Sequence, residues 1–137
     1  MPIATRKHSA IQSRFSQLMV GFPDFEANTK LTCQIRTGKY LVPDFAVQAR
    51  SRIQDPYPTA PVHLCVEILS PDDRLSQVIA KCEDYHDWGV EVVWIVDPEN
   101  PRAWEFRKGQ WPVEVPLTGS LTAPGISISL PELFSVL

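Results

Sequence analysis

The spacing of hydrophobic residues divides the chain into helical and extended segments. Between Ser9 and Val20, apolar residues recur every three or four positions, which predicts an amphipathic helix. Val62–Leu69 is almost wholly apolar, as in a strand that is buried on both faces. A second helix is predicted over 70–88, with Ser70 placed to cap its start and Gly89 to end it.

Other segments carry weaker strand signals. Pro43 lies inside one of them and indicates an edge strand or an interrupted ladder. The order of helix, three strands, helix and strand favours a single α/β domain over residues 1–137. The expected strands are Leu31–Arg36, Tyr40–Ala49, Val90–Val96, a hairpin of Ala103–Arg107 with Trp111–Val115, and Ile126–Ser129, and a loop is expected at Arg50–Pro61 and a helical turn at Pro131–Val136.

Two carboxylates fall inside these hydrophobic segments. Glu67 stands between Val66 and Ile68, and Asp44 lies within the segment LVPDFAV. A buried carboxylate must be protonated, paired or bound to a metal. Two such groups about 4 Å apart repel by roughly 4 kcal/mol at an effective dielectric constant of about 20. A dication between them turns this net repulsion into attraction. Oxygen ligands suit Mg²⁺ or Mn²⁺, although an ion pair of Glu67 with Lys or Arg is the alternative.

The second predicted helix adds a polar stripe. Gln77, Lys81 and Tyr85 are spaced by four residues and therefore share one side of that helix. Lys81 borders the apolar face, so its ammonium could reach a phosphate near the two acids. The alternative is a lysine that covers apolar surface and ends in water.

The charge balance limits the kind of nucleic-acid surface that the chain can offer. Thirteen Lys and Arg residues stand against sixteen Asp and Glu residues, which excludes a wide basic surface. Phosphate binding would then depend on a local cluster of positive side chains. The candidates for such a cluster are Arg36, Lys39, Arg50 and Arg52, with His8 able to reach the acids from the first helix.

The cysteines and the apolar segments indicate the cellular compartment of the protein. Cys33, Cys65 and Cys82 lack the paired spacing of a zinc site, so buried, reduced thiols are expected. No apolar run approaches the roughly 20 residues that a membrane helix needs. The N-terminal sequence MPIATRKHSA also lacks the apolar stretch of a signal peptide. We therefore expect a cytoplasmic protein with no membrane contact.

Several of these residues form an ordered set. Pro43 and Asp44 come first, then the segment VEILSP at 66–71, then Lys81 and Tyr85, and finally WIVDP at 94–98. Over roughly His8 to Arg107 this set resembles the Uma-type endonucleases of the PD-(D/E)XK nuclease superfamily. The resemblance implies a restriction-endonuclease-like fold, with an αβββαβ core and a central mixed sheet flanked by helices.

The resemblance also implies roles for individual residues. Asp44 and Glu67 match the two acids that hold a divalent metal, with the backbone carbonyl of Ile68 as a third ligand. The position two residues after Glu67 is Leu69, where the superfamily pattern has lysine. In families of this kind the lysine lies on the following helix, and Lys81 is then the match.

Two hypotheses from different functional classes follow. The first is a Mg²⁺-dependent (or Mn²⁺-dependent) endonuclease that hydrolyses phosphodiester bonds in DNA, as a homodimer if two sites are to cut two strands; RNA is a weaker alternative substrate. The second is a catalytically inactive nuclease-fold module that binds nucleic acid or protein. The position of Lys81 relative to Asp44 and Glu67 discriminates between them, because catalysis needs all three together.

Overall fold

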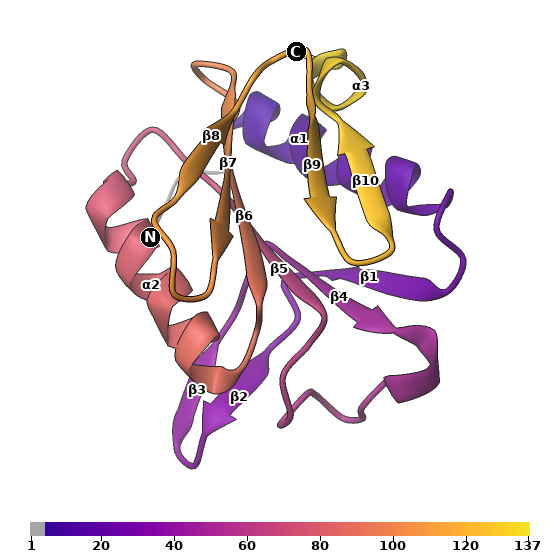
Figure 1. Ribbon diagram of the computed structural model, residues 1–137, viewed down its shortest axis with the longest axis vertical. Coiled ribbons are helices and arrows are strands. Elements are labelled where there is room, and N and C mark those ends of the chain that lie inside the picture. The colour runs from indigo at the N-terminus through magenta and orange to yellow at the C-terminus, as the bar shows by residue number, and fades with distance from the viewer. Residues whose placement is uncertain (1–4) are drawn as a thin grey trace.

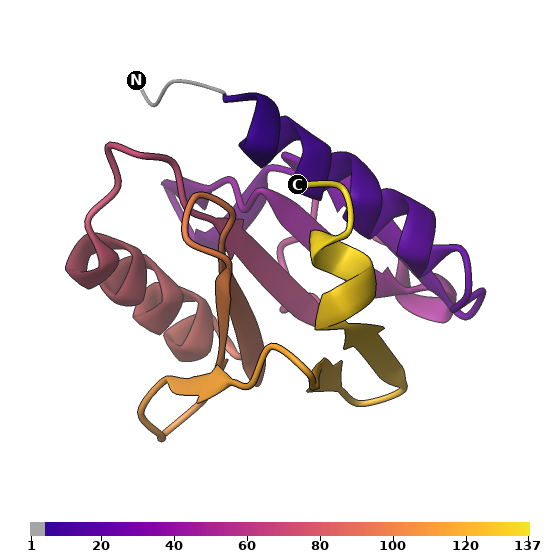
Figure 2. The same cartoon turned by 90° about the horizontal axis from the view of Figure 1, so that it is seen from above.

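A six-stranded mixed sheet forms the centre of the molecule. In the computed structural model, which describes residues 5–137, the sheet lies between helices α1 (Arg6–Met19) and α2 (Leu75–Trp88) (Figures 1 and 2). β5 and β6 are parallel, and all other neighbours are antiparallel. The fold class expected from the sequence is thereby confirmed. In spatial order the strands are β1 (Phe25–Thr29), β4 (Phe45–Ala49), β5 (Leu64–Ile68), β6 (Val92–Asp97), β7 (Arg102–Arg107) and β8 (Val113–Val115).

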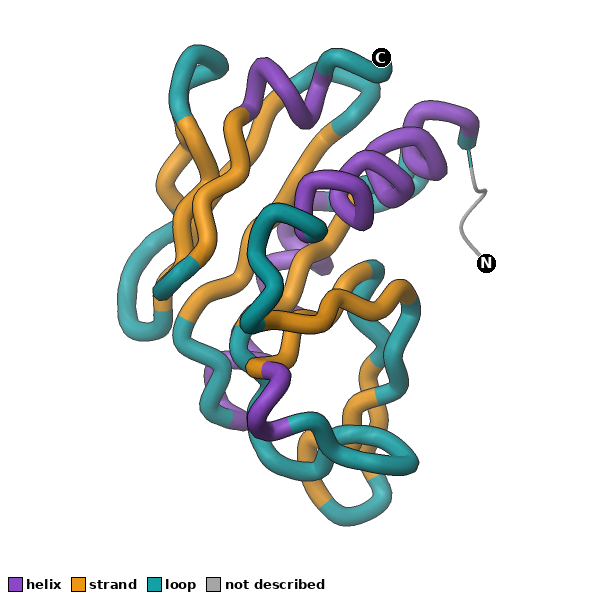
Figure 3. Tube along the Cα trace, turned by 90° about the vertical axis from the view of Figure 1, so that its right-hand side faces the viewer, coloured by secondary structure: helices purple, strands orange, loops and turns teal. Residues whose placement is uncertain are grey.

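Two hairpins extend from this sheet. β2 (Cys33–Arg36) pairs with β3 (Lys39–Leu41) beside α2 (Figure 1). β9 (Ser120–Ala123) pairs with β10 (Ile126–Ser129), and the chain then enters α3 (Leu130–Phe134). α3 packs against α1. Figure 3 shows the helices in purple beside the strands in orange. A short 3₁₀ helix, η1 (Arg50–Arg52), follows β4.

Helix α1 covers one face of the sheet. The Thr5 side chain accepts a hydrogen bond from the His8 N–H and so caps its first turn. Ile11, Phe15 and Met19 are buried at helical spacing and join the larger hydrophobic core. Every second residue of β4 and β5, such as Phe45 and Val66, faces α1. Apolar contact therefore holds α1 against the strand that contains Glu67 and the strand that follows Asp44.

Helix α2 covers the opposite face. Cys82 and Tyr85 are fully buried there against residues such as Cys65 and Ile95. Gly89, with φ of 124°, ends the helix as expected. Because α1 and α2 bury both faces of β5 and β6, the near-continuous apolar sequence of these strands is explained. The three cysteines are free and buried, as predicted.

Of the three strands that precede α2 in the main sheet, β4 and β5 lie within predicted strands, whereas β1 does not. β1 was missed altogether, and the predicted strand Leu31–Arg36 belongs instead to the separate β2–β3 hairpin. The predicted strand Tyr40–Ala49 is interrupted at Pro43, since β3 ends at Leu41 and β4 begins at Phe45. Proline lacks the N–H needed to continue the ladder, which accounts for the break.

The start of α2 also differs from the prediction. The helix begins at Leu75, and Ser70 instead donates its N–H and hydroxyl to Asp73 Oδ2 at 2.8 and 3.0 Å. This local turn competes with helical hydrogen bonding. β9 was not predicted, whereas the hairpin of β7 and β8 was.

None of the helices within residues 5–137 combines the length and the apolar character needed to cross a membrane.

Candidate active site

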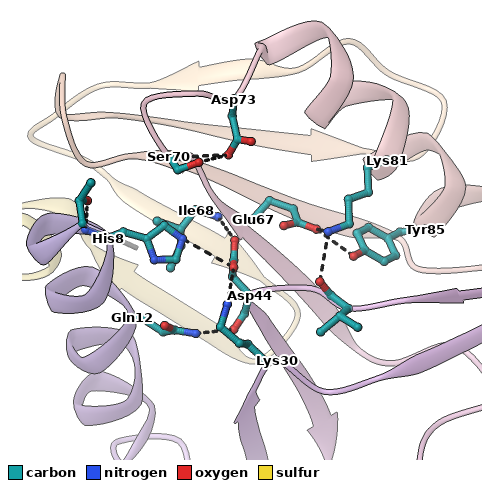
Figure 4. Close-up of polar contacts among 12 residues, drawn as sticks. His8, Gln12, Lys30, Asp44, Glu67, Ile68, Ser70, Asp73, Lys81 and Tyr85 are labelled. Carbon is teal, nitrogen blue, oxygen red and sulfur yellow. Dashed lines mark hydrogen bonds and ion pairs between the residues drawn. The ribbon is translucent and has the colours of Figure 1, made fainter. Parts of the chain in front are cut away.

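The two predicted acids line one pocket. Asp44 directly precedes β4, Glu67 lies in β5, and Phe45 pairs with Val66 across these antiparallel strands. One further step along this register sets Asp44 opposite Glu67, so both side chains leave the same face of the sheet. They open into a pocket of about 350 Å³ (Figure 4). Its remaining lining residues are His8, Lys30, Val42, Ile68, Ser70, Asp73, Gln77, Val78 and Lys81.

Asp44 is held by several contacts with neighbouring residues. Its Oδ2 accepts a hydrogen bond of 2.7 Å from the Ile68 N–H, and its main-chain oxygen accepts from Gln12 Nε2 and from the Lys30 N–H, each at 3.1 Å. Oδ1 lies 3.6 Å from His8 Nε2 and 3.8 Å from Lys30 Nζ. These contacts leave the carboxylate oriented into the pocket (Figure 4).

The same contacts decide the charge of Asp44 and His8. Burial raises the pKa of Asp44, but the polar contact with His8, the Ile68 N–H and the charge of Lys30 outweigh it and lower the pKa below its usual range. The Asp44 carboxylate in turn raises the pKa of His8 against the opposing effect of burial. Asp44 is therefore the more readily ionised of the two acids.

Glu67 is almost completely buried, with 6% of its surface exposed. Its Oε1 accepts hydrogen bonds of 2.8 Å from Lys81 Nζ and from the Tyr85 hydroxyl. Its other oxygen makes no hydrogen bond with any residue of 5–137 and faces toward Asp44 in Figure 4. Burial and the charge of Asp44 raise the pKa of Glu67 to about 7, although Lys81 and Tyr85 oppose the rise.

Lys81 completes the group. Besides its contact with Glu67, Nζ donates to the Val42 carbonyl at 3.1 Å. The alternative in which this lysine ends in water is therefore wrong. Of its two partners in the predicted stripe, Gln77 lines the pocket, whereas Tyr85 is fully buried beneath Glu67.

Sequence reasoning missed Lys30 and underrated His8. Lys30 has a left-handed backbone, with φ of 50°, in the turn between β1 and β2, and its main chain is bonded to Asp44. The residues around Lys30 in the sequence do not indicate that it contacts Asp44, because this contact depends on β1, which was not predicted. Among the described residues, the pocket lining contains none of the four candidate basic residues Arg36, Lys39, Arg50 and Arg52.

The oxygen donors fit a hard divalent cation better than zinc. No cluster of three or more His, Cys, Asp or Glu side chains with metal-binding geometry occurs within residues 5–137. Mg²⁺, however, is commonly bound through one or two carboxylates with several retained waters. Asp44 and Glu67 are two carboxylates on one pocket, each with a positively charged neighbour, Lys30 and Lys81.

Comparisons with known proteins identify the fold and the family of the chain. A crystal structure of "a putative nuclease belonging to DUF820" from Anabaena variabilis is 24% identical, with a TM-score of 0.84, and the match covers 98% of this chain and 84% of that one. A cryo-electron microscopy structure of a DrdV–DNA complex matches with a TM-score of 0.53 and 17% identity, over 81% of this chain but 10% of the other. No curated protein matches.

The family assignment rests on nearly the whole chain. Residues 1–134 match the Uma2 family, which is described as "Putative restriction endonuclease". The likeness to the DUF820 structure shows that the chain has the fold of that protein. The nuclease family suggested by the ordered residues around Asp44, Glu67 and Lys81 is thereby confirmed. The chain belongs to the Uma2 family of restriction-endonuclease-like proteins.

Proposed function

We propose that this protein is a Mg²⁺- or Mn²⁺-dependent endonuclease that hydrolyses phosphodiester bonds in DNA. The observation that carries the proposal is the convergence of Asp44, Glu67 and Lys81 on one open pocket, with Lys81 Nζ 2.8 Å from Glu67. Buried acids beside a lysine are typical of sites that bind and activate charged substrates. Glu67 is ion-paired with Lys81, the pairing that the sequence offered as the alternative to a metal at this acid, and a bound cation would join that pair.

The two acids and the carbonyl of Ile68 would hold the metal. The mutual repulsion of Asp44 and Glu67, which contributes to the raised pKa of Glu67, supports a cation between them. When bound, such a metal lowers the pKa of a coordinated water and polarises the phosphoryl oxygens. The contact of Oδ2 with the Ile68 N–H keeps Asp44 in place without that cation.

Lys81 would stabilise the negative charge that develops on the attacked phosphate. Its two hydrogen bonds, to Glu67 and to the Val42 carbonyl, hold the ammonium in one place at the pocket wall. A charge that is already oriented needs no reorganisation when the substrate reacts. His8 and Lys30 add positive charge on the Asp44 side, where a phosphodiester backbone would enter.

DNA is the proposed substrate for two reasons. The family is described as "Putative restriction endonuclease", and the structure of the DrdV–DNA complex contains a related fold. Cleavage of both strands of a duplex would need two copies of this site. We therefore expect a homodimer, which analytical ultracentrifugation at several protein concentrations would test.

The decisive experiment follows cleavage of supercoiled, linear and single-stranded DNA with Mg²⁺, Mn²⁺ or EDTA. Asp44→Asn, Glu67→Gln and Lys81→Met should each reduce cleavage by at least 100-fold, since each removes a group that acts on the reacting phosphate. Glu105→Gln is a matched control, because Glu105 is as little exposed as Asp44, with 17% for both side chains, but is paired with Arg107. Lys39→Met, at an ion pair with Asp84, is the control for Lys81.

Two results would overturn the proposal. Cleavage that survives all three site variants would come from a contaminant or another site. Wild-type protein that binds DNA but cleaves none of the three forms with either metal would indicate the binding module instead.

A further inference from the structure

A second pocket lies next to the candidate active site. It has a volume of about 460 Å³ and is bordered by β1, the turn that follows it, and the loop after η1. Lys30 lines both pockets and so forms part of the wall between them. A substrate strand that passes Asp44 can therefore continue past Lys30 into this second space.

The strand β4 links the two pockets. Side chains two residues apart on a strand share a face, so Gln48 projects on the same side of the sheet as Asp44. Gln48 also pairs across the sheet with Glu26, which lines the second pocket. Cross-strand partners point to the same face, and Gln48 accordingly lines the second pocket together with Glu26.

Gln48 offers a hydrogen-bond donor without a partner. The residue is only 4% exposed, and its Oε1 accepts from the Gln54 N–H at 3.3 Å. Its Nε2 donates to no residue within 5–137, yet no polar side-chain atom of the described residues is both sealed from solvent and unbonded. The amide nitrogen therefore keeps contact with solvent, and Gln48 lines this pocket as well as a neighbouring one that includes His63 and Gly89. A buried amide that is free to donate is a recognition group for a polar ligand.

The wall around this amide is rigid. Gln54 Nε2 donates to the Ala60 carbonyl at 3.0 Å, and Gln54 Oε1 accepts from the N–H groups of Thr59 and Ala60 at 3.0 and 2.9 Å. Tyr57, on the loop that these bonds close, lines the pocket and stands edge-to-face with Tyr40 at 5.8 Å. The pocket thus has an aromatic ring in a preformed loop.

The charges of the pocket favour a base over a phosphate. Glu26 and Asp55 line it and would repel a phosphate group, whereas Lys30 lies at its boundary with the active site. Carboxylates accept hydrogen bonds from exocyclic amino groups such as that of cytosine, and Asn or Gln pairs with adenine. Asn28, which also lines the pocket, adds a second amide.

We propose that this pocket receives a nucleobase of the substrate strand, and that it favours adenine or cytosine over thymine. The inference rests on the proposed function and gives it a base preference beside the cleaved bond. Lys30 holds the intervening phosphate, Gln48 and the carboxylates bond the edge of the base, and Tyr57 stacks on its face.

The test measures binding without cleavage. Fluorescence anisotropy in metal-free buffer gives Kd values for short single-stranded oligonucleotides of dA, dC or dT. Wild-type protein should bind dA and dC about 5-fold or more tightly than dT. Glu26→Ala combined with Asp55→Ala should reduce this ratio toward one, since these carboxylates accept from the exocyclic amino group. Gln48→Leu and Tyr57→Ala should each weaken binding of all three by about 5-fold or more, since a single donor and a stacking ring both tolerate every base. Gln110→Leu, at an exposed glutamine on the β7–β8 turn, should change neither value.

The outcomes separate this inference from the proposed activity. Equal binding of the three oligonucleotides by wild-type protein, or an unchanged preference in the Glu26→Ala, Asp55→Ala double variant with unchanged affinity in Tyr57→Ala, overturns the base pocket. If Gln48→Leu does not fold, Asn28→Ala replaces it as the test of the amide contact. Absence of cleavage in the metal-dependent assay overturns the nuclease proposal and leaves the binding measurement valid.

Discussion

The carboxylate of Asp44 is bonded to the main chain of Ile68, the residue that follows Glu67, through a hydrogen bond of 2.7 Å. This bond ties the first acid, at the broken end of one strand, to the strand that carries the second. The spacing of the two acids is therefore set by the backbone and does not depend on a bound metal. A site built in this way is preorganised.

The Asp44–Ile68 bond predicts different stabilities for two substitutions. Asp44→Ala leaves the Ile68 N–H without its acceptor and should lower the free energy of unfolding by about 1–3 kcal/mol. Asp44→Asn keeps an acceptor oxygen and should cost less, although it removes the charge required for a metal. Urea denaturation in EDTA measures both values. Equal losses for the two variants would show that the bond does not hold the acid in place.

Tyr85 acts on Glu67 from below the pocket. Its hydroxyl donates to Glu67 Oε1 at 2.8 Å, and the ring is fully buried. Tyr85→Phe should therefore lower the free energy of unfolding by about 1–3 kcal/mol above pH 7, where the acceptor is ionised. Thermal denaturation at pH 8 checks this. Tyr40→Phe is the control and should cost almost nothing, because Tyr40 is exposed and its hydroxyl accepts a long hydrogen bond of 3.4 Å from Gln34.

The strongest hydrophobic patterns predicted the core elements correctly. α1 followed from its helical spacing, and β5 followed from an apolar run that only burial on both faces explains. β1 failed because Phe25–Thr29 is an edge strand with no fully buried residue, so its sequence lacks clear alternation. Pattern alone cannot locate a strand that is defined by its partner, here β4.

The sequence identified site residues where a charged side chain lies within or beside a hydrophobic segment. Asp44 and Glu67 stood out as acids among aliphatic residues, and Lys81 followed from its place on a helix beside that core. Lys30 could not be found, since it reaches Asp44 through the β1–β2 turn and a left-handed backbone. Such a contact depends on tertiary geometry that no local pattern records.

Metal binding should stabilise the protein through the two acids. A ligand bound only to the folded state adds about 2.7 kcal/mol when its concentration is 100 times its Kd. We expect Mg²⁺ to raise the Tm of the wild-type protein and of Glu105→Gln. It should have no effect on Asp44→Asn or Glu67→Gln. Differential scanning fluorimetry over a Mg²⁺ titration tests this, and an equal rise in all four proteins would place the metal elsewhere.

The protonation of Glu67 gives the metal-free protein a defined pH dependence. The pKa of Glu67 is about 7 in the folded state and has an ordinary value of 4.5. Between these values the folded state binds more protons than the unfolded state, so stability falls as pH rises. The loss should be on the order of 3 kcal/mol and complete above pH 7.

Denaturant titrations from pH 4 to 8 in EDTA measure this dependence. Glu67→Gln should show a smaller decline than the wild-type protein over the same range, since its amide does not titrate. His8, whose pKa is raised, adds a further loss above its ordinary value of 6.5 in both proteins. Parallel curves for the two proteins would contradict the raised pKa of Glu67.

Lys30 allows charge and backbone strain to be separated at one position. Lysine at φ of 50° carries a conformational cost of about 1 kcal/mol that glycine does not. Lys30→Gly should therefore keep or increase the free energy of unfolding, while Lys30→Ala retains the strain. Both variants remove the charge 3.8 Å from Asp44, so both should bind DNA more weakly and reduce the slope of log Kd against log salt by about one. A Lys30→Gly variant that binds DNA with the wild-type salt dependence would show that this lysine contacts no phosphate.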